Sequence, residues 1–141
     1  MRTFYMFKIK KEFISLYKDN YRILYDSLKR IYMLDKSDVE YGYNLLFQLI
    51  DIIKKEDIDR HLFVKLHNKM FYTKQDNDHI INNLYKDEIS ILRIKSTYIK
   101  LEINKDYSMF FDILYNKHDN YFVCDFINDD YFFLRDVKVL V

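Results

Sequence analysis

Four histidines are the first residues of this sequence that could hold a metal ion or move a proton: His61, His67, His79 and His118. His61 and His67 are six residues apart, a spacing that shares a face on a strand but not on a helix. The sequence contains neither a His-Glu-x-x-His pattern nor a second cysteine, and zinc sites usually rely on such ligand patterns. The sequence therefore predicts no metal site and ordinary surface or half-buried imidazoles.

The single cysteine, Cys124, is the next candidate for chemistry, and it lies in an apolar run between Val123 and Asp125. A nucleophilic thiol needs a base and surroundings that stabilise the thiolate. The sequence indicates neither, so we expect a buried, structural thiol. A lone thiol cannot form an internal disulfide, which fits a reducing compartment.

Carboxylates for acid–base chemistry could come from residues 76–78 or from Asp129–Asp130. Both segments lie where turns are expected, and Asp and Asn are common turn residues. The single glycine, Gly42, excludes a glycine-rich phosphate loop; it lies inside a predicted helix, where it would let another element approach closely. The sequence shows no catalytic constellation, so it predicts a protein that is not an enzyme and uses no cofactor.

Length and charge define the class of protein. The chain has 141 residues, the usual size of one domain, and we expect a single domain over residues 1–141. Its 23 basic and 22 acidic residues are mixed along the sequence and give a net charge of +1. No basic stripe is present for phosphates, so direct nucleic-acid binding is not predicted. Lysines interrupt the apolar residues at the N-terminus and no long uncharged apolar segment follows, so we expect a soluble, cytoplasmic protein.

The first part of the chain predicts a strand followed by helices. Residues 3–9 are rich in aromatic and β-branched types, as strands are. From Lys11 the apolar period changes to three and four residues, which is typical of a helix face. Asp19–Asn20 could divide this stretch into a short and a longer helix, because both side chains compete for backbone hydrogen bonds. The apolar positions are Phe13, Tyr17, Tyr21, Leu24, Leu28 and Ile31.

A further helix is predicted after residue 36. Ser37 and Glu40 have the spacing of a capping box, with the serine at the N-cap. From residue 57 to residue 87 the pattern is ambiguous. Asp57 could cap a short helix, but residues 61–67 also alternate like a strand. The expected core stripe of the capped helix is Val39, Tyr43, Leu46, Ile50 and Ile53.

The second half of the chain predicts two hairpins and a helix. Residues 88–94 and 97–103 alternate apolar and polar side chains around a short turn, as a hairpin does. Residues 106–118 have a helical period, and residues 120–127 and 130–135 bracket a second turn. We therefore expect an α+β domain in which helices cover one face of a small, mainly antiparallel sheet.

Phe13 and Tyr17 are four residues apart and hence neighbours on one helix face. Two roles are open to them. They could begin the core stripe that continues to Leu24, or they could be rigid surface anchors for a partner protein. The pattern alone favours the core.

Both ends of the chain resemble one known family. The opening has a strand with alternating aromatics followed by "IKKEFISLY", with Phe13 and Tyr17 in place. The tail reads "YFVCDFINDDYFFLRDVK". These two stretches, the length and the order of elements are similar to the sporulation inhibitor of replication family (SirA). The middle of the chain matches mainly in pattern.

This resemblance implies a function. Members of the family are small, non-enzymatic cytoplasmic proteins that bind domain I of the replication initiator DnaA and block chromosome replication at sporulation. The resemblance implies that Phe13 and Tyr17 contact domain I, and that the second helix adds Phe47 and Gln48. Two other interpretations stay open: a small α+β enzyme of unknown substrate, and a SirA-like interaction module with a different partner.

Overall fold

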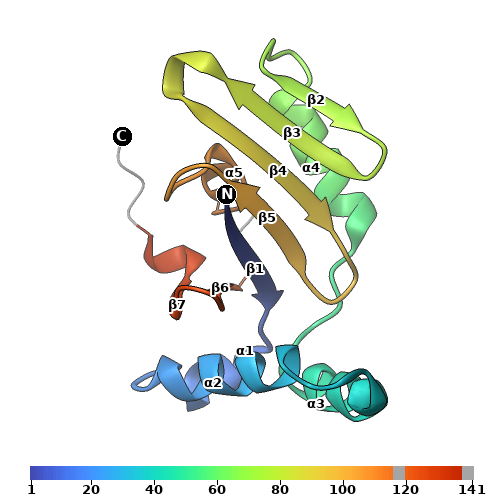
Figure 1. The fold of residues 1–141 in the computed structure, drawn as a ribbon, viewed down its shortest axis with the longest axis vertical. Coiled ribbons are helices and arrows are strands. Elements are labelled where there is room, and N and C mark those ends of the chain that lie inside the picture. Colours follow the sequence, from blue (N-terminus) through green and yellow to red (C-terminus); the bar gives the residue numbers. More distant parts are fainter. Residues whose placement is uncertain (116–119, 138–141) are drawn as a thin grey trace.

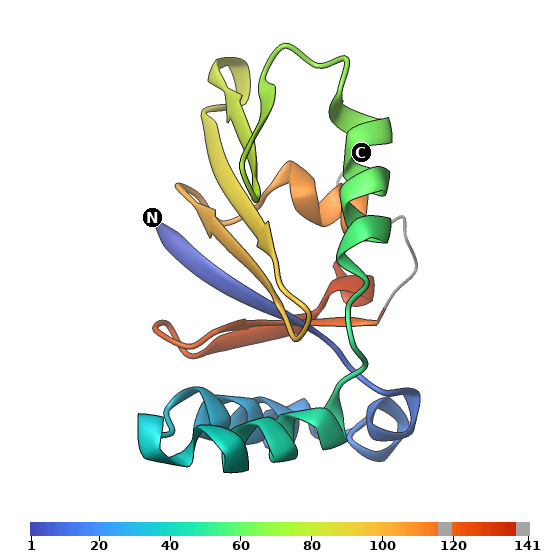
Figure 2. The same ribbon diagram turned by 90° about the vertical axis from the view of Figure 1, so that its right-hand side faces the viewer.

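The computed structural model describes residues 1–115 and 120–137. In this part of the chain, an antiparallel sheet of seven strands carries helices on both faces (Figures 1 and 2). The strand order is β2-β3-β4-β5-β1-β6-β7. The predicted α+β class with an antiparallel sheet is confirmed. The helices, expected on one face, lie on both faces.

The elements follow one another in an order close to the prediction. The strands are β1 (Arg2–Lys8), β2 (Tyr72–Gln75), β3 (Asp78–Asn83), β4 (Glu88–Ile94), β5 (Ile99–Ile103), β6 (Tyr121–Asp125) and β7 (Asp130–Phe133). The helices are α1 (Lys11–Leu16), α2 (Tyr21–Tyr32), α3 (Val39–Leu49), α4 (Lys55–Leu66) and α5 (Met109–Tyr115). Short 3₁₀ turns lie at Lys36–Asp38, Leu84–Lys86 and Leu134–Asp136.

Strand β1 lies inside the sheet, paired with β5 on one side and with β6 on the other. Successive side chains of a strand point to opposite faces, so β1 supplies two separate cores. Phe4 and Met6 belong to one hydrophobic cluster and Phe7 to the other. The aromatic side chains of Phe4 and Phe7 therefore pack beneath helices on opposite faces of the sheet.

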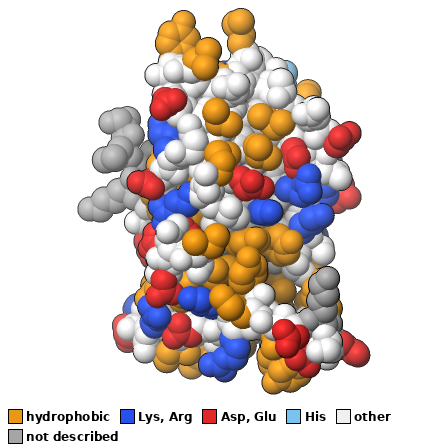
Figure 3. Space-filling model, viewed as in Figure 1, with side chains coloured by type: hydrophobic (Ala, Val, Ile, Leu, Met, Phe, Trp, Pro, Cys, Tyr) orange, Lys and Arg blue, Asp and Glu red, His pale blue; other side chains and the backbone are white. Residues whose placement is uncertain are grey.

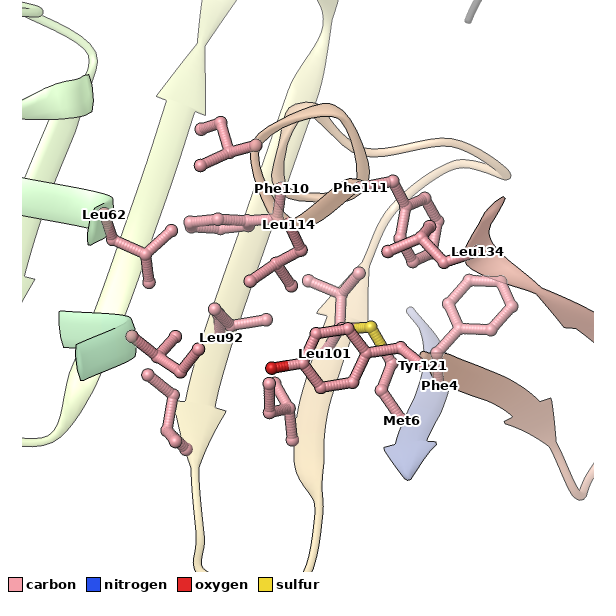
Figure 4. Packing of buried hydrophobic residues seen from close by; sticks show 14 of the residues in the cluster. Phe4, Met6, Leu62, Leu92, Leu101, Phe110, Phe111, Leu114, Tyr121 and Leu134 are labelled. Atoms are coloured by element: carbon pink, nitrogen blue, oxygen red, sulfur yellow. The ribbon is translucent and has the colours of Figure 1, made fainter. Parts of the chain in front are cut away.

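The first core lies between the sheet and helices α4 and α5 (Figure 4). Leu62 of α4 and Leu114 of α5 are fully buried here. The ring of Phe4 packs edge-on against that of Phe111, with centroids 5.5 Å apart, an arrangement that aromatic quadrupoles favour. The burial of these large apolar side chains fixes α4 and α5 on the sheet.

The second core lies under α1, α2 and α3, which form one layer beside β6 and β7 (Figure 2). Ile14 and Leu24 pack there with Cys124 of β6. Cys124 is buried, as the sequence predicts, and this burial raises the pKa of its thiol well above the ordinary value. Gly42 of α3 lies against the end of α2, where an added Cβ would come within 3.0 Å of Leu34 Cδ1. The predicted close approach at Gly42 is confirmed.

The start of α3 differs from the prediction. The helix begins at Val39, its N-cap residue is Asp38, and no side chain caps it. Ser37 lies instead in the preceding 3₁₀ turn. The predicted capping box is therefore wrong.

The buried face of α3 is also turned relative to the prediction. Leu46 is buried as expected, but Val39 and Tyr43 are exposed. The buried position one turn before Leu46 is Gly42, because only the absence of a side chain lets α2 come so close. Ile50 and Ile53, the remaining members of the predicted stripe, are buried beyond the end of the helix.

Elsewhere the element boundaries shift by a few residues. The break at Asp19–Asn20 is confirmed, since α1 ends before it and α2 begins after it. The ambiguous stretch after residue 57 is helical as far as Leu66, but that helix, α4, has Lys54 at its N-cap, so a cap by Asp57 is wrong. Both hairpins are confirmed. The predicted helix over 106–118 is α5, which is shorter, and residues 116–118 lie outside the described residues.

A cluster of charges fixes the start of β1. The Arg2 guanidinium donates from Nε to Asp125 at 2.6 Å, from Nη2 to Asp130 at 2.7 Å and from Nη1 to Asp106 at 2.9 Å. Asp125 also accepts hydrogen bonds from the backbone and side-chain amides of Asn128. Burial alone would raise the pKa of Asp125, but the hydrogen bonds from Asn128 and Arg2 hold it below its ordinary value. Arg2 thereby joins the beginning of the chain to the β6–β7 turn.

Asp125→Ala should therefore lower the free energy of unfolding by roughly 2–4 kcal/mol, because it leaves the Arg2 charge without its buried partner. Asp106→Ala is the matched control: it removes another carboxylate from the same arginine, but this one is 90% exposed. We expect a loss below about 1 kcal/mol for the control. Urea unfolding followed by circular dichroism measures both values, and equal losses would contradict the assignment.

Candidate protein-binding surface

Helix α1 presents an apolar face to the surface. Leu16 is 68% exposed, and Phe13 and Tyr17 are half-buried. Positions 13, 16 and 17 are neighbours on one helix face, because they are three and four residues apart. Within α1, the buried residue is Ile14. Ile14 thus anchors the helix in the second core, Leu16 is exposed, and Phe13 and Tyr17 each keep part of their surface accessible.

The Phe13 and Tyr17 rings are held in a fixed arrangement. They stack with centroids 6.2 Å apart and planes 15° from parallel. Both rings also pack against the edge of the second core. The two roles left open by the sequence therefore meet at these residues: each ring borders the core, and each keeps part of its surface exposed.

Phe47 and Gln48, which follow each other on α3, point into different grooves. Gln48 lines a groove between α2 and α3 together with Arg30 and Tyr41. Phe47 lines another groove, between α3 and the β4–β5 turn. Successive residues of a helix differ in direction by about 100°, which explains the separation.

The groove that contains Gln48 ends near the start of α1. The backbone N–H of Lys10 donates to the carbonyl of Leu49 at 3.0 Å, and Ile9 forms an isolated β-bridge with Ile50. Helices α1, α2 and α3 lie together in one layer at one end of the molecule (Figures 1 and 2). Gln48 and the apolar face of α1 are therefore parts of the same helical layer.

Two exposed side chains of this layer were missed by the sequence analysis. Leu16 has the i+3 spacing from Phe13 that could have identified it. Tyr41 lines the groove beside Gln48 and is exposed. The sequence pattern predicted the wrong buried face for α3, so it did not identify Tyr41 as an exposed residue.

Comparison with protein families identifies the chain. The family model described as "Sporulation inhibitor of replication protein SirA" matches residues 2–138. The chain belongs to the SirA family. No curated protein matches the sequence. The family description names a regulatory inhibitor of replication in sporulation rather than an enzyme. Among the described helices, none has the length and apolar character needed to cross a membrane.

Candidate chemistry in this SirA-family chain centres on one buried histidine. His79 Nε2 lies 2.6 Å from Asp59 Oδ1, and its Nδ1 lies 2.7 Å from the Tyr72 hydroxyl. Lys55 donates to the other oxygen of Asp59 at 2.6 Å. Sequence analysis did not bring these residues together, because they come from α4, β2 and β3. Burial and the charge of Asp59 raise the pKa of Tyr72, and the hydrogen bonds of the cluster join α4 to the β2–β3 hairpin.

The other histidines are separate from this cluster. His61 Nε2 donates to the carbonyl of Ile113 at 3.0 Å, and His67 Nδ1 donates to the carbonyl of Phe63 at 2.8 Å. His118 lies outside the described residues. Within residues 1–115 and 120–137, no group of three or more His, Cys, Asp or Glu side chains could hold a metal ion.

The His79 cluster predicts how stability depends on pH. Burial lowers the pKa of His79 below its ordinary value of 6.5, although Asp59 partly opposes this. In the unfolded chain the ordinary pKa returns, so the unfolded state binds more protons below pH 6.5 and stability must fall as the pH decreases. Asp59 stays ionised in this range, because hydrogen bonds from Lys55 and His79 lower its pKa in spite of burial. Urea unfolding between about pH 7 and about pH 5 should show this loss of free energy.

The substitution His79→Gln removes the titrating group and should flatten that pH dependence. His67→Gln is the control, because His67 lies exposed on the same part of the fold. It should leave the slope unchanged. A slope that survives His79→Gln would show that another group controls it.

Proposed function

We propose that this protein inhibits the initiation of chromosome replication during sporulation by binding domain I of DnaA in the cytoplasm. The observation that carries the proposal is the exposed apolar face of α1 in a member of the SirA family. Phe13 and Tyr17 lie on that face, at the positions where the family resemblance implies the contact. Leu16 extends the face between them.

This face has the physical character of a binding hot spot. Protein interfaces draw most of their energy from a few large anchors at the centre, surrounded by a polar rim. Phe13 and Tyr17 are already stacked on each other and against the core, so binding would cost little side-chain entropy. Arg30 and Gln48, which line the groove between α2 and α3, supply polar groups for the rim.

Inhibition on this account requires occupancy and no catalysis. The protein covers a surface of domain I, so the effect is stoichiometric with DnaA. With 23 basic and 22 acidic residues spread along the chain, the protein lacks the clustered cations that phosphate contacts need. It therefore acts on the initiator and does not compete with it for DNA.

Leu16→Glu tests the proposal with little risk to the fold. Leu16 is mostly exposed, so the melting temperature should stay within a few degrees of the parent. Placing a charge at the centre of the interface should weaken binding to purified domain I by about 2 kcal/mol or more, roughly thirtyfold. Tyr17→Ala should weaken binding by a similar factor. Isothermal titration calorimetry measures both affinities.

Two controls separate binding from folding. Ile127→Glu places the same charge at another exposed aliphatic residue, 82% exposed in the β6–β7 turn, and should leave the affinity unchanged. Leu46→Ala truncates a buried side chain and should lower the melting temperature instead, since such a change costs about 2–5 kcal/mol. If Leu16→Glu and Tyr17→Ala bind domain I as tightly as the parent, the contact is not made by α1. If the parent itself does not bind domain I, the protein is a SirA-like module with another partner.

A further inference from the structure

The groove between α2 and α3 combines an apolar lining with a single charged side chain. Four of its lining residues are half-buried aliphatic residues: Ile31, Leu34, Leu45 and Leu49. Its polar lining residues are Ser27, Gln48 and the exposed Tyr41. Arg30 is the charged residue of this lining, and it is exposed. Among the described residues that line the groove, none is acidic.

Arg30 has no ion-pair partner within the described part of the chain, although its neighbours on α2 have one. Asp26, one turn earlier, accepts a hydrogen bond of 3.1 Å from Arg22 Nε. Lys29 donates to Asp129 at 3.3 Å. Arg30 lies in the last turn of α2, but the end of a helix carries only roughly half an elementary negative charge. The charge of Arg30 is therefore largely uncompensated.

Elsewhere on the surface, acidic and basic side chains lie beside one another. Figure 3 shows this mixture over one face of the molecule. Asp35, which follows α2, lines a separate pocket together with Val39. The groove thus differs from the rest of the surface, because no acidic residue of its lining offsets the positive charge of Arg30.

The groove is formed by supported walls and is small. Leu34 packs closely against Gly42 of α3, and the carbonyl of Leu49 accepts a hydrogen bond of 3.0 Å from the backbone N–H of Lys10, the residue before α1. The groove leaves about 240 Å³ open, less than the ~300–1,000 Å³ of pockets that hold small-molecule ligands. Its size therefore suits side chains of a protein that also covers α1.

We propose that Arg30 binds a carboxylate of DnaA domain I whose neighbouring apolar side chain packs on the aliphatic lining of the groove. A guanidinium binds a carboxylate through two N–H groups at once. Charge complementarity selects this occupant, because the groove has a cation and no acidic residue. One cation is too few for a nucleic-acid backbone, and a second copy placed groove to groove would bring Arg30 against Arg30. The pairing rests on the proposed function and adds the chemistry that domain I must present.

Isothermal titration calorimetry of full-length variants with purified domain I tests the pairing. Arg30→Met keeps a long side chain and removes its charge, so the Kd should rise on the order of tenfold. Arg30→Lys keeps the charge at the helix end but cannot bind a carboxylate through two N–H groups of one planar group, so the Kd should rise by a smaller factor. The affinity of the parent should fall as salt is added, and Arg30→Met should reduce that dependence.

Arg22→Met is the matched control, because it removes the same charge from the same helix. Arg22 already pairs with Asp26 and Asp129, so this variant should leave the Kd unchanged. The partner group is found by replacing the acidic residues of domain I one at a time by their amides. One replacement should weaken binding to the parent and have no further effect on Arg30→Met, as expected for two groups that interact directly.

The same measurements decide against the pairing if it is wrong. An unchanged Kd and salt dependence for Arg30→Met would overturn it; if Leu16→Glu still weakens binding, the proposed function stands without it. A rise in Kd that couples to no acidic residue of domain I would also overturn it. Self-association of the parent that Arg30→Met abolishes would identify a second copy as the occupant and contradict the pairing. If the parent does not bind domain I, the proposed function fails and the pairing fails with it.

Discussion

The alternation of side chains along β1 is the constraint on which the rest of the structure depends. This strand pairs on both edges and sends Phe4 and Met6 to one core and Phe7 to the other. A shift of one residue in its register would exchange the two faces and empty both cores. Arg2 opposes such a shift, because its guanidinium binds Asp125 of β6 at the start of the strand.

The position of the helical layer follows from the other end of β1. The chain enters α1 directly after Ile9 and Lys10, which bond to the end of α3. These bonds hold one side of the helical layer on the second core. The apolar face of α1 remains exposed on the surface of the layer. The rings of Phe13 and Tyr17 are stacked and border that core, so the surface proposed for binding is already ordered in the free protein.

The sequence predicted those parts of the fold that local alternation controls. Both hairpins and the opening strand follow from a period of two, and the break at Asp19–Asn20 follows from two side chains that compete with the backbone. The prediction of the buried face of α3 was wrong, because the buried position one turn before Leu46 is Gly42. Glycine has no side chain and therefore adds nothing to a hydrophobic pattern. The cluster of Asp59, Tyr72 and His79 could not be foreseen, since it depends on contacts between elements. For the candidate site, pattern alone favoured the core, and only the family resemblance indicated a contact role for Phe13 and Tyr17.

The central claim is that the protein stops replication by occupying DnaA through α1. The most direct measurement is the origin-to-terminus ratio of the host chromosome while the protein is overproduced to defined levels. The account predicts that the ratio falls in proportion to dose with the parent protein, and that it stays constant with an equally abundant Leu16→Glu variant. An unchanged ratio at protein levels that match or exceed those of DnaA would contradict it, as would an equal fall with both proteins.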